Sequence, residues 1–412
     1  MKQRALFLVL AFIFFEWLDF SLYLYLAKSV FAKEFFPASN YSLILSFTLF
    51  AAAYFARPLG GWFFGRAADL NGRRHPMLLS AALMGIATLG ICILPNYQQI
   101  GLAATWGLLL LRIAQALALG GEINTSAMFL VEHHPTKPLI AGGLVAVSSA
   151  LGMFVGGSLA SLLQLINFEQ AWRVVFAIVG LLSLWICRLR KQLTESPEFQ
   201  KNYAKEIYPW RPYWQGLVNI AAMGVFVSVM VYICNVFWVS FAVDQQFMTR
   251  TQCSWLGSLA QFISAALALP VAYFSRPQYA YRLIQVSMLI LMLTAPLLFH
   301  FTTLHYRSAT LLFLLAYALS NSLLCAALYY FLYLQLPSQY RCRGVSTIWA
   351  LAASVGAISL PLAEQAKIMG VLWLPGMFVS ITACVCLMLL HFSHENSKPL
   401  LAAWRPSLPV AD

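Results

Sequence analysis

The chain has 412 residues, of which 61% are hydrophobic and 10% are charged, with a formal net charge of +12. Soluble domains carry about 45–50% apolar and about 25% charged residues, and a soluble globule of the present composition could not cover its surface. The composition excludes a soluble enzyme, a disordered chain and a secreted disulfide scaffold. It predicts an all-α polytopic membrane protein.

The first apolar run covers residues 5–27 and is interrupted by Glu16 and Asp19. No small-residue cleavage site follows it, so we expect a retained first helix and not a signal peptide. Similar runs recur along the chain, most of them near or above the ~18 apolar residues that mark a spanning helix. We therefore expect twelve transmembrane helices, at 5–27, 41–64, 77–95, 101–130, 140–164, 171–189, 214–241, 253–274, 282–303, 308–334, 344–364 and 370–391.

Lysine and arginine are divided unevenly between the two sides of this arrangement. The side that holds the N-terminus carries 18 basic residues, the opposite side carries 5, and the remaining 3 lie within or at the edge of spans. A basic excess marks the cytoplasmic side of a membrane protein. We therefore expect both termini in the cytoplasm, and the net charge then requires no nucleic-acid partner.

The midpoint of the chain carries its longest internal loop, at about residues 189–213. Pro135 and Gly142, after the fourth span, are matched in type and spacing by Pro337 and Gly344, after the tenth, at an offset of 202 residues. Loop and repeat together predict two pseudo-symmetric halves. We expect a first six-helix bundle at 1–190, a cytoplasmic linker at 191–213, a second six-helix bundle at 214–391 and a short cytoplasmic tail at 392–412.

Five ionisable residues lie within predicted spans of the first half. They are Glu16, Asp19, Arg57, Arg112 and Glu122, whereas the positions 202 residues later hold only Val, Ala and Leu. Each such residue costs about 2.5–3.5 kcal/mol or more in a spanning helix. A network that only holds helices together is one explanation. We favour a pathway for a substrate and protons.

The acidic members of this set are candidates for proton coupling. Glu16, Asp19 and Tyr23 are spaced i, i+3 and i+7, so they share one face of the first helix. Two close carboxylates disfavour joint ionisation, which suits a group that takes up and releases a proton. We predict that Glu16, Asp19 or Glu122 carries the proton and that Tyr23 contributes to the substrate site.

The basic members are candidates for binding an anionic substrate, because a guanidinium binds a carboxylate in a bidentate manner. Arg112, Gln115 and Glu122 lie on one stripe of the fourth helix. Arg112 and Glu122 are about 15 Å apart along its axis and cannot pair directly. Each therefore needs another partner: a carboxylate of the first helix, Arg57 or a bound ligand.

The second half offers polar and aromatic groups in place of charges. A buried amide needs a hydrogen-bond partner, and aromatic side chains can line a ligand cavity. The predicted substrate-binding residues of this half are Asn235, Trp238, Asn321 and Tyr329.

Several segments resemble a known group of proteins. Residues 65–74, GRAADLNGRR, resemble the cytoplasmic signature of the major facilitator superfamily, and Arg112-x-x-Gln115 is similar to its fourth-helix motif. The segments at 16–20, 56–61, 120–122, 132–133, 172–176 and 195–199 resemble the metabolite:proton symporter family. The resemblance implies the major facilitator fold, a bacterial inner membrane location, and import of an organic acid or zwitterion with protons by alternating access. It also implies that Asp69, Arg73 and Arg74 are gate residues.

We therefore expect a proton-coupled importer of a small anionic or zwitterionic metabolite, acting as a monomer in the lipid bilayer. An importer of a larger polycarboxylate, such as a carboxylate siderophore, and a drug or metabolite efflux antiporter are the alternatives. We expect no enzymatic activity, no cofactor and no metal site, because Cys384-x-Cys386 has no further His or Cys pair near it.

Overall fold

The structure is a computed structural model that describes residues 3–26, 30–37, 49, 52–163, 170–202 and 213–403. Every regular element in these ranges is helical. In the first half the helices are α1 (Gln3–Leu26), α2 (Ala32–Glu34), α4 (Arg57–Asn71), α5 (Arg74–Ile93), α6 (Tyr97–Ile100), α7 (Leu102–His133), α8 (Pro138–Leu163) and α9 (Ala171–Arg190).

The linker contributes α10 (Pro197–Asn202). In the second half the helices are α11 (Trp214–Val231), η3 (Tyr232–Phe237), α12 (Trp238–Asp244), α13 (Arg250–Phe274), η4 (Pro277–Tyr279), α14 (Ala280–Thr303), α15 (Arg307–Gln335), α16 (Arg341–Ala357), α17 (Ser359–Ile368) and α18 (Leu374–Ala403).

Eleven helical stretches within the described residues are long and apolar enough to cross a membrane. They match the predicted spans other than 41–64, of which residues 41–48, 50 and 51 lie outside the described residues. The predicted seventh span comprises α11, η3 and α12, and the predicted eleventh comprises α16 and α17. The last helix continues to Ala403, beyond the predicted end of that span at 391.

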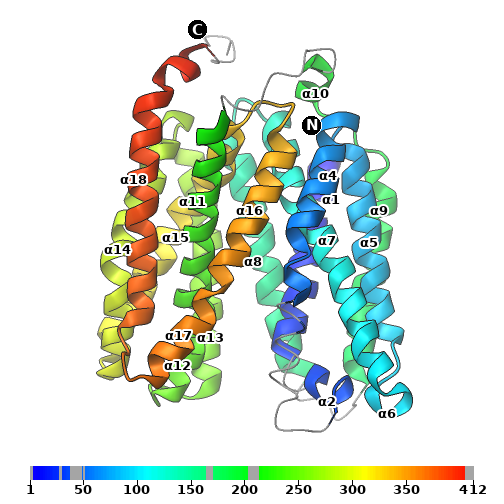
Figure 1. Cartoon of the computed structure of the whole chain (residues 1–412), viewed down its shortest axis with the longest axis vertical. Helices are drawn as coiled ribbons and strands as arrows, with labels where there is room; N and C mark the ends of the chain where they lie inside the picture. Colours follow the sequence, from blue (N-terminus) through cyan, green and yellow to red (C-terminus); the bar gives the residue numbers. More distant parts are fainter. Residues whose placement is uncertain are drawn as a thin grey trace.

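The long helices run roughly parallel to the long axis of the molecule and gather in two groups (Figure 1). One group holds α1, α4, α5, α7 and α9, and the other holds α11, α14, α15 and α18. Helix α8 contacts both α13 and α15, and α4 contacts α16, so these pairs form the seam between the halves. The start of α1 and the end of α18 lie at the same end of the bundle, which we call the terminus end (Figure 1).

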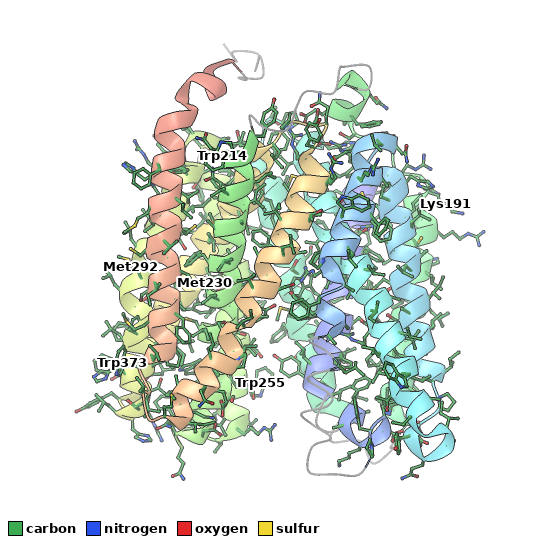
Figure 2. The ribbon with its side chains drawn as sticks, viewed as in Figure 1. Lys191, Trp214, Met230, Trp255, Met292 and Trp373 are labelled. Carbon is green, nitrogen blue, oxygen red and sulfur yellow. The ribbon has the colours of Figure 1, made fainter. Side chains whose placement is uncertain are left out.

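Exposed tryptophans mark both ends of the helices. Trp214 lies toward the terminus end, whereas Trp255 and Trp373 lie toward the opposite end (Figure 2). Each of the three exposes more than half of its surface, with fractions of 56%, 56% and 52%. Indole rings concentrate where a bilayer meets water. Their positions therefore fit a molecule whose helices cross a membrane between these two levels.

Two local features shape the seam. The π-helical turn at Tyr232–Phe237 interrupts the regular hydrogen bonding between α11 and α12, a distortion common at functional sites. Gly65 of α4 packs directly on the backbone of α16, where an added Cβ would lie 2.6 Å from the Cα of Arg343. Only a residue without a side chain allows this approach, so Gly65 lets α4 and α16 meet at the terminus end.

Candidate functional site

A buried polar cluster joins three helices of the first half. The side-chain amide of Gln115 on α7 donates to Oδ2 of Asp19 on α1 at 2.8 Å and to Oγ1 of Thr88 on α5 at 2.9 Å. Thr88 in turn donates to Oδ1 of Asp19 at 3.1 Å. Arg112 donates to Oε1 of Gln115 at 2.6 Å, and its guanidinium lies 4.0 Å from the centre of the Tyr23 ring. Asp19 and Arg112 are therefore connected through a neutral amide.

A small cavity adjoins this cluster. It offers about 20 Å³ for the centres of water molecules, enough for about one or two waters. The polar side chains on its wall are Asp19, Arg112, Gln115 and Tyr54. Two predicted substrate residues of the first half, Arg112 and Gln115, thus line the same cavity as the predicted proton residue Asp19, whereas Tyr23 and Arg57 are not part of its wall.

Arg57 lies at the seam between the halves. Its side chain is buried, with 6% of the residue exposed. It donates to the hydroxyl of Tyr54 at 2.5 Å, and that hydroxyl lies 3.0 Å from the hydroxyl of Tyr232 on η3. No carboxylate among the described residues lies within 4.0 Å of this guanidinium. A chain of two phenols therefore links a buried cation of the first half to the second half.

Glu16 is buried one turn before Asp19 on α1, with 1% of the residue exposed. Neither of its carboxyl oxygens has a hydrogen-bond partner within the described part of the chain. The charged groups that act on it are Glu122, Arg57, Arg190 and Asp19. A buried carboxylate without a hydrogen bond is costly when ionised, which distinguishes Glu16 from the well-bonded Asp19.

The carboxylate of Glu122 forms an ion pair with an arginine that was not among its predicted partners. Arg190, at the end of α9, donates to Oε1 of Glu122 at 2.5 Å, and both side chains are fully buried. Ser126 donates to the same oxygen at 2.7 Å and Ser80 to the other at 2.5 Å. The expectation that Glu122 pairs with the first helix, Arg57 or a ligand is wrong. Arg190, counted as a loop charge for orientation, turns inward because α9 packs on α5 and α1.

The polar side chains predicted in the second half differ in their surroundings. Asn235 donates to the carbonyl of Gly257 at 2.9 Å, and Asn321 approaches Oε1 of Gln261 at 3.4 Å. Trp238 is fully buried and donates to Thr302 on α14 at 3.1 Å, so it points into its own bundle. The structure does not bring Trp238 to the cavity.

Tyr329 is a predicted residue of the second half that packs against residues of the first. It packs against a cluster that contains Phe20, Tyr54 and Ile123 of the first half and Ala353 of the second. Tyr329 therefore belongs to the same seam as Arg57.

A second group of buried charges joins the halves at the terminus end. Asp69, near the end of α4, accepts hydrogen bonds from the backbone N–H groups of Cys342 at 3.0 Å and Arg343 at 2.9 Å. These N–H groups belong to the first turn of α16, where free donors and the helix dipole favour a carboxylate. The contact ties α4 of the first half to α16 of the second.

Glu132, at the end of α7, lies between arginines from opposite halves. Its Oε1 accepts from Arg73 at 3.1 Å and from Arg341 at 2.9 Å, and all three side chains are fully buried. Arg73 also donates to the carbonyl of Ser338 at 2.9 Å, and Arg341 pairs with Glu198 of α10 at 2.9 Å. We call the following five residues the terminus-side clasp: Asp69, Arg73, Glu132, Glu198 and Arg341.

The linker takes part in these contacts. Glu195 accepts hydrogen bonds from the backbone N–H groups of Arg73 at 2.8 Å and Arg74 at 3.1 Å. The hydroxyl of Tyr333 on α15 donates to Glu198 at 2.9 Å. The guanidinium of Arg74 donates to the carbonyl of Lys191. These contacts of Arg74 stay between the first half and the linker, in contrast to those of Asp69 and Arg73.

Several residues of these groups had no role in the sequence analysis. Glu132 and Glu198 occur in the segments that carry the family resemblance, which was the available signal for them. Arg341 and Arg190 follow apolar runs and were treated as loop charges. For Tyr232 the sequence indicated only a place in the seventh span. The π-helical turn that directs its side chain toward Tyr54 cannot be predicted from the sequence. Within the described ranges, no group of three or more His, Cys, Asp or Glu side chains is placed to hold a metal ion.

Two helical bundles that meet at a membrane-buried polar seam, with buried charges joining them at one end, have the architecture of a secondary transporter. The chain belongs to the Major Facilitator Superfamily, whose family model matches residues 9–361. It is therefore a multi-pass membrane transporter, and the expectation that it is not an enzyme is confirmed by this membership.

Curated relatives are similar over different shares of the chain. The alpha-ketoglutarate permease of Escherichia coli K12 is 29% identical over 329 residues, which is 67% of this chain and 73% of that protein. The shikimate transporter of the same strain is 34% identical over 45% of this chain and 44% of its own length. The proline/betaine transporter of Salmonella typhimurium is 33% identical over 46% of this chain and 39% of its own length.

Solved structures share the fold at low sequence identity. The human organic anion transporter MFSD10 superposes with a TM-score of 0.69 at 17% identity, covering 95% of this chain and all of that one. The proton:xylose symporter XylE superposes with a TM-score of 0.68 at 15% identity, over 95% of this chain and 94% of that one. The predicted all-α fold of the superfamily is confirmed.

Proposed function

We propose that this transporter imports a small organic anion or zwitterion together with protons by alternating access. The observation that carries the proposal is Arg57, a buried guanidinium at the seam whose hydrogen-bond partner is the neutral hydroxyl of Tyr54. A buried cation whose hydrogen-bond partner is neutral is poorly compensated, and a carboxylate is its best-matched ligand. A substrate carboxylate would therefore dock on Arg57 and compete with Tyr54 for it.

The second cation, Arg112, gives the substrate site a second basic position. Arg112 lies beside the cavity and already shares Gln115 with Asp19. Two buried cations, Arg57 at the seam and Arg112 beside the cavity, favour an anionic substrate over a neutral one. The relatives named for ketoglutarate, shikimate, proline and betaine support a small metabolite that carries at least one carboxylate.

Proton coupling is assigned to Glu16 and Asp19. Glu16 has no hydrogen-bond partner among the described residues, and Asp19 is one turn away on the same helix. Protonation of either group removes a negative charge that competes with the substrate for the two arginines. Glu122 is better suited to a structural role, because Arg190, Ser80 and Ser126 bind it.

The terminus-side clasp supplies one gate of the alternating-access cycle. With the terminus end in the cytoplasm, as the distribution of basic residues predicts, the clasp closes the cytoplasmic side. The site then loads from outside, and opening of the clasp releases substrate and proton inward. In this scheme the transporter acts as a monomer in a bacterial inner membrane. Its two six-helix bundles are residues 1–190 and 214–391, with a linker at 191–213 and a tail at 392–412.

The test is uptake into proteoliposomes under an imposed pH gradient, with labelled 2-oxoglutarate, shikimate, proline and betaine as substrates. We expect accumulation of a carboxylate that disappears when the gradient is collapsed. Arg57→Gln should abolish binding, and Glu16→Gln or Asp19→Asn should leave exchange but abolish accumulation. Arg173→Gln is the matched control, because Arg173 belongs to the first half but contacts Glu34, at the end opposite the termini. Accumulation that persists without a gradient, or in Arg57→Gln, would refute the proposal.

A further inference from the structure

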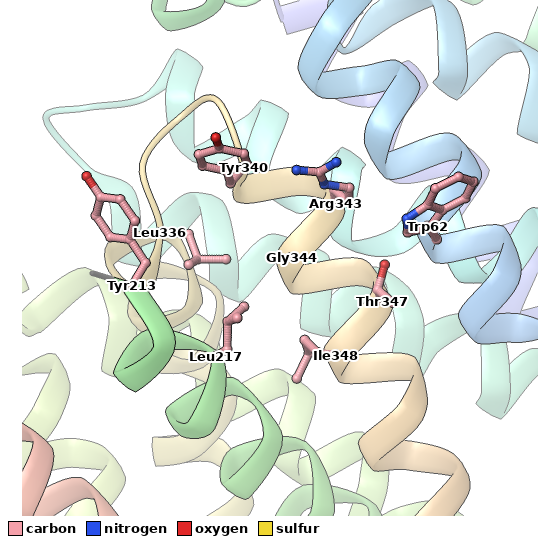
Figure 3. A pocket seen from close by; sticks show the side chains of 9 residues that line it. All are labelled: Trp62, Tyr213, Leu217, Leu336, Tyr340, Arg343, Gly344, Thr347 and Ile348. Carbon is pink, nitrogen blue, oxygen red and sulfur yellow. The ribbon is translucent and has the colours of Figure 1, made fainter. Parts of the chain in front are cut away.

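A groove opens at the terminus end of the seam, apart from the polar cavity. Its volume is about 270 Å³, and its wall is formed by α4, α11 and α16, with α16 between the other two helices (Figure 3). The residues that line it are Trp62, Tyr213, Leu217, Leu336, Tyr340, Arg343, Gly344, Thr347 and Ile348. Trp62 comes from the first half, and the remaining residues come from the second half and its entry.

The groove has a polar end and an apolar end. Tyr213, Tyr340 and Arg343 stand at the start of their helices, toward the terminus end, whereas Leu217 and Ile348 lie about one turn further along α11 and α16 (Figure 3). This order, with aromatic and basic groups outside and aliphatic groups inside, follows the order of a phospholipid from headgroup to acyl chain.

The helices that flank the groove present apolar side chains outward. On α4, Leu59 and Phe63 are exposed, and on α16 Leu351 and Val355 are exposed. In a membrane-spanning protein such side chains face hydrocarbon. Two of the helices that line the groove therefore also carry exposed apolar side chains, which suits contact with lipid.

The polar end carries a cation. The backbone N–H of Arg343 is bonded to Asp69, but its guanidinium rests 5.3 Å from the centre of the Tyr340 ring and has no hydrogen bond or ion pair with any described side chain. A guanidinium of this kind binds a phosphate oxygen by charge-assisted hydrogen bonds. Anionic lipids are concentrated in the cytoplasmic leaflet, the leaflet predicted for this end.

We propose that the groove binds one anionic phospholipid of the bilayer, with its phosphate on Arg343 and an acyl chain over Leu217 and Ile348. Because Trp62 and Arg343 belong to opposite halves and lie beside the contact of Asp69 with α16, this lipid bridges the seam where the clasp closes it. The proposal does not depend on the transported substrate.

Photo-crosslinking tests this assignment. The full chain is placed in phosphatidylcholine nanodiscs that contain a trace of photoactivatable phosphatidylglycerol, and the labelled peptides are mapped. We expect labels on the peptides that contain Tyr213–Leu217 and Tyr340–Ile348. Arg343→Gln should lower the yield about tenfold, the effect of losing a charge-assisted hydrogen bond. Thr347→Trp, which fills the groove without changing charge, should also block labelling.

The matched control is Arg282→Gln. Arg282 lies at the same end of the molecule and rests on Tyr279 three residues earlier, as Arg343 rests on Tyr340, but it belongs to α14, outside the groove. Arg282→Gln should leave the yield unchanged, and thermal unfolding should show that the variants remain folded. Equal losses in the two arginine variants would overturn the proposal in favour of general attraction to the membrane surface.

Equal labelling by a photoactivatable phosphatidylcholine would overturn the requirement for an anionic headgroup. Labels confined to other peptides would show that the groove does not hold lipid.

Discussion

Asp69→Asn should shift the transporter toward a state that is open at the terminus end. The carboxylate accepts two backbone N–H groups at the start of α16 and lies 3.5 Å from Arg73. Asparagine keeps one acceptor oxygen, loses the charge and presents an amide donor to a backbone donor. Hydrogen bonds to charged groups contribute about 1.5–3 kcal/mol each, so we expect the closed state to lose about 2–3 kcal/mol.

The lost free energy changes the ratio of closed to open molecules, in addition to any change in the free energy of unfolding. Asp69 belongs to the first half and α16 to the second, so the two hydrogen bonds exist only while the terminus end is closed. At 1.4 kcal/mol for each factor of ten, the ratio of closed to open molecules should fall roughly 30- to 140-fold. The expected direction is a larger open fraction with little change in the unfolding of either half.

Distances between spin labels at His75 and Gln278 measure this equilibrium, because both positions are exposed at the terminus end, one in each half. Asp69→Asn should add or enlarge a long-distance population. The control is Asp244→Asn, which removes the same charge from an ion pair with Lys367 inside the second half. A distance distribution in Asp69→Asn that matches both the wild type and this control would refute the reasoning.

Three further outcomes follow from the buried contacts. Arg190→Met should lower the free energy of unfolding by about 3–5 kcal/mol, because Glu122 is left without its cation. Thermal unfolding should show that stability is partly recovered when Glu122→Leu is added. No recovery in the double variant would contradict the pairing. Gly65→Ala should lengthen the same spin-label distances, since a Cβ there would lie 2.6 Å from the Cα of Arg343; unchanged distances would show that α4 and α16 do not need this approach. Glu16→Gln should leave thermal stability unchanged or raised because the carboxylate has no described partner; a loss as large as that of Arg190→Met would reveal a structural partner.

Much of the first-half site could be predicted from the sequence. Asp19 and Gln115 lie on helices whose faces follow from residue spacing, and the cost of burying a polar group in a membrane directs such faces inward. The contact between Asp19 and Gln115, and the approach of Arg112 to Gln115, therefore follow from which residues share the inward-facing side of each helix. The sequence also indicated that Glu122 needs a partner, but not which one, because that choice depends on the packing of α9.

The second half was less predictable. Asn235 and Trp238 are separated by three residues, which on a regular helix places them on one face. The π-helical turn at Tyr232–Phe237 changes that register, so Asn235 bonds to α13 while Trp238 points toward α14. The same turn brings the hydroxyl of Tyr232 to Tyr54 across the seam.

The sequence by itself determined the fold class, the spans other than the second and the concentration of buried charge in the first half. These properties depend on composition and local periodicity, because a bilayer admits only apolar helices whose backbone groups are bonded internally. Only the tertiary structure decided the partners: Arg190 for Glu122, Arg73 and Arg341 for Glu132, and α16 for Asp69. Such pairs join residues far apart along the chain, and a charge at a helix end has the same sequence context whether it faces water or is buried.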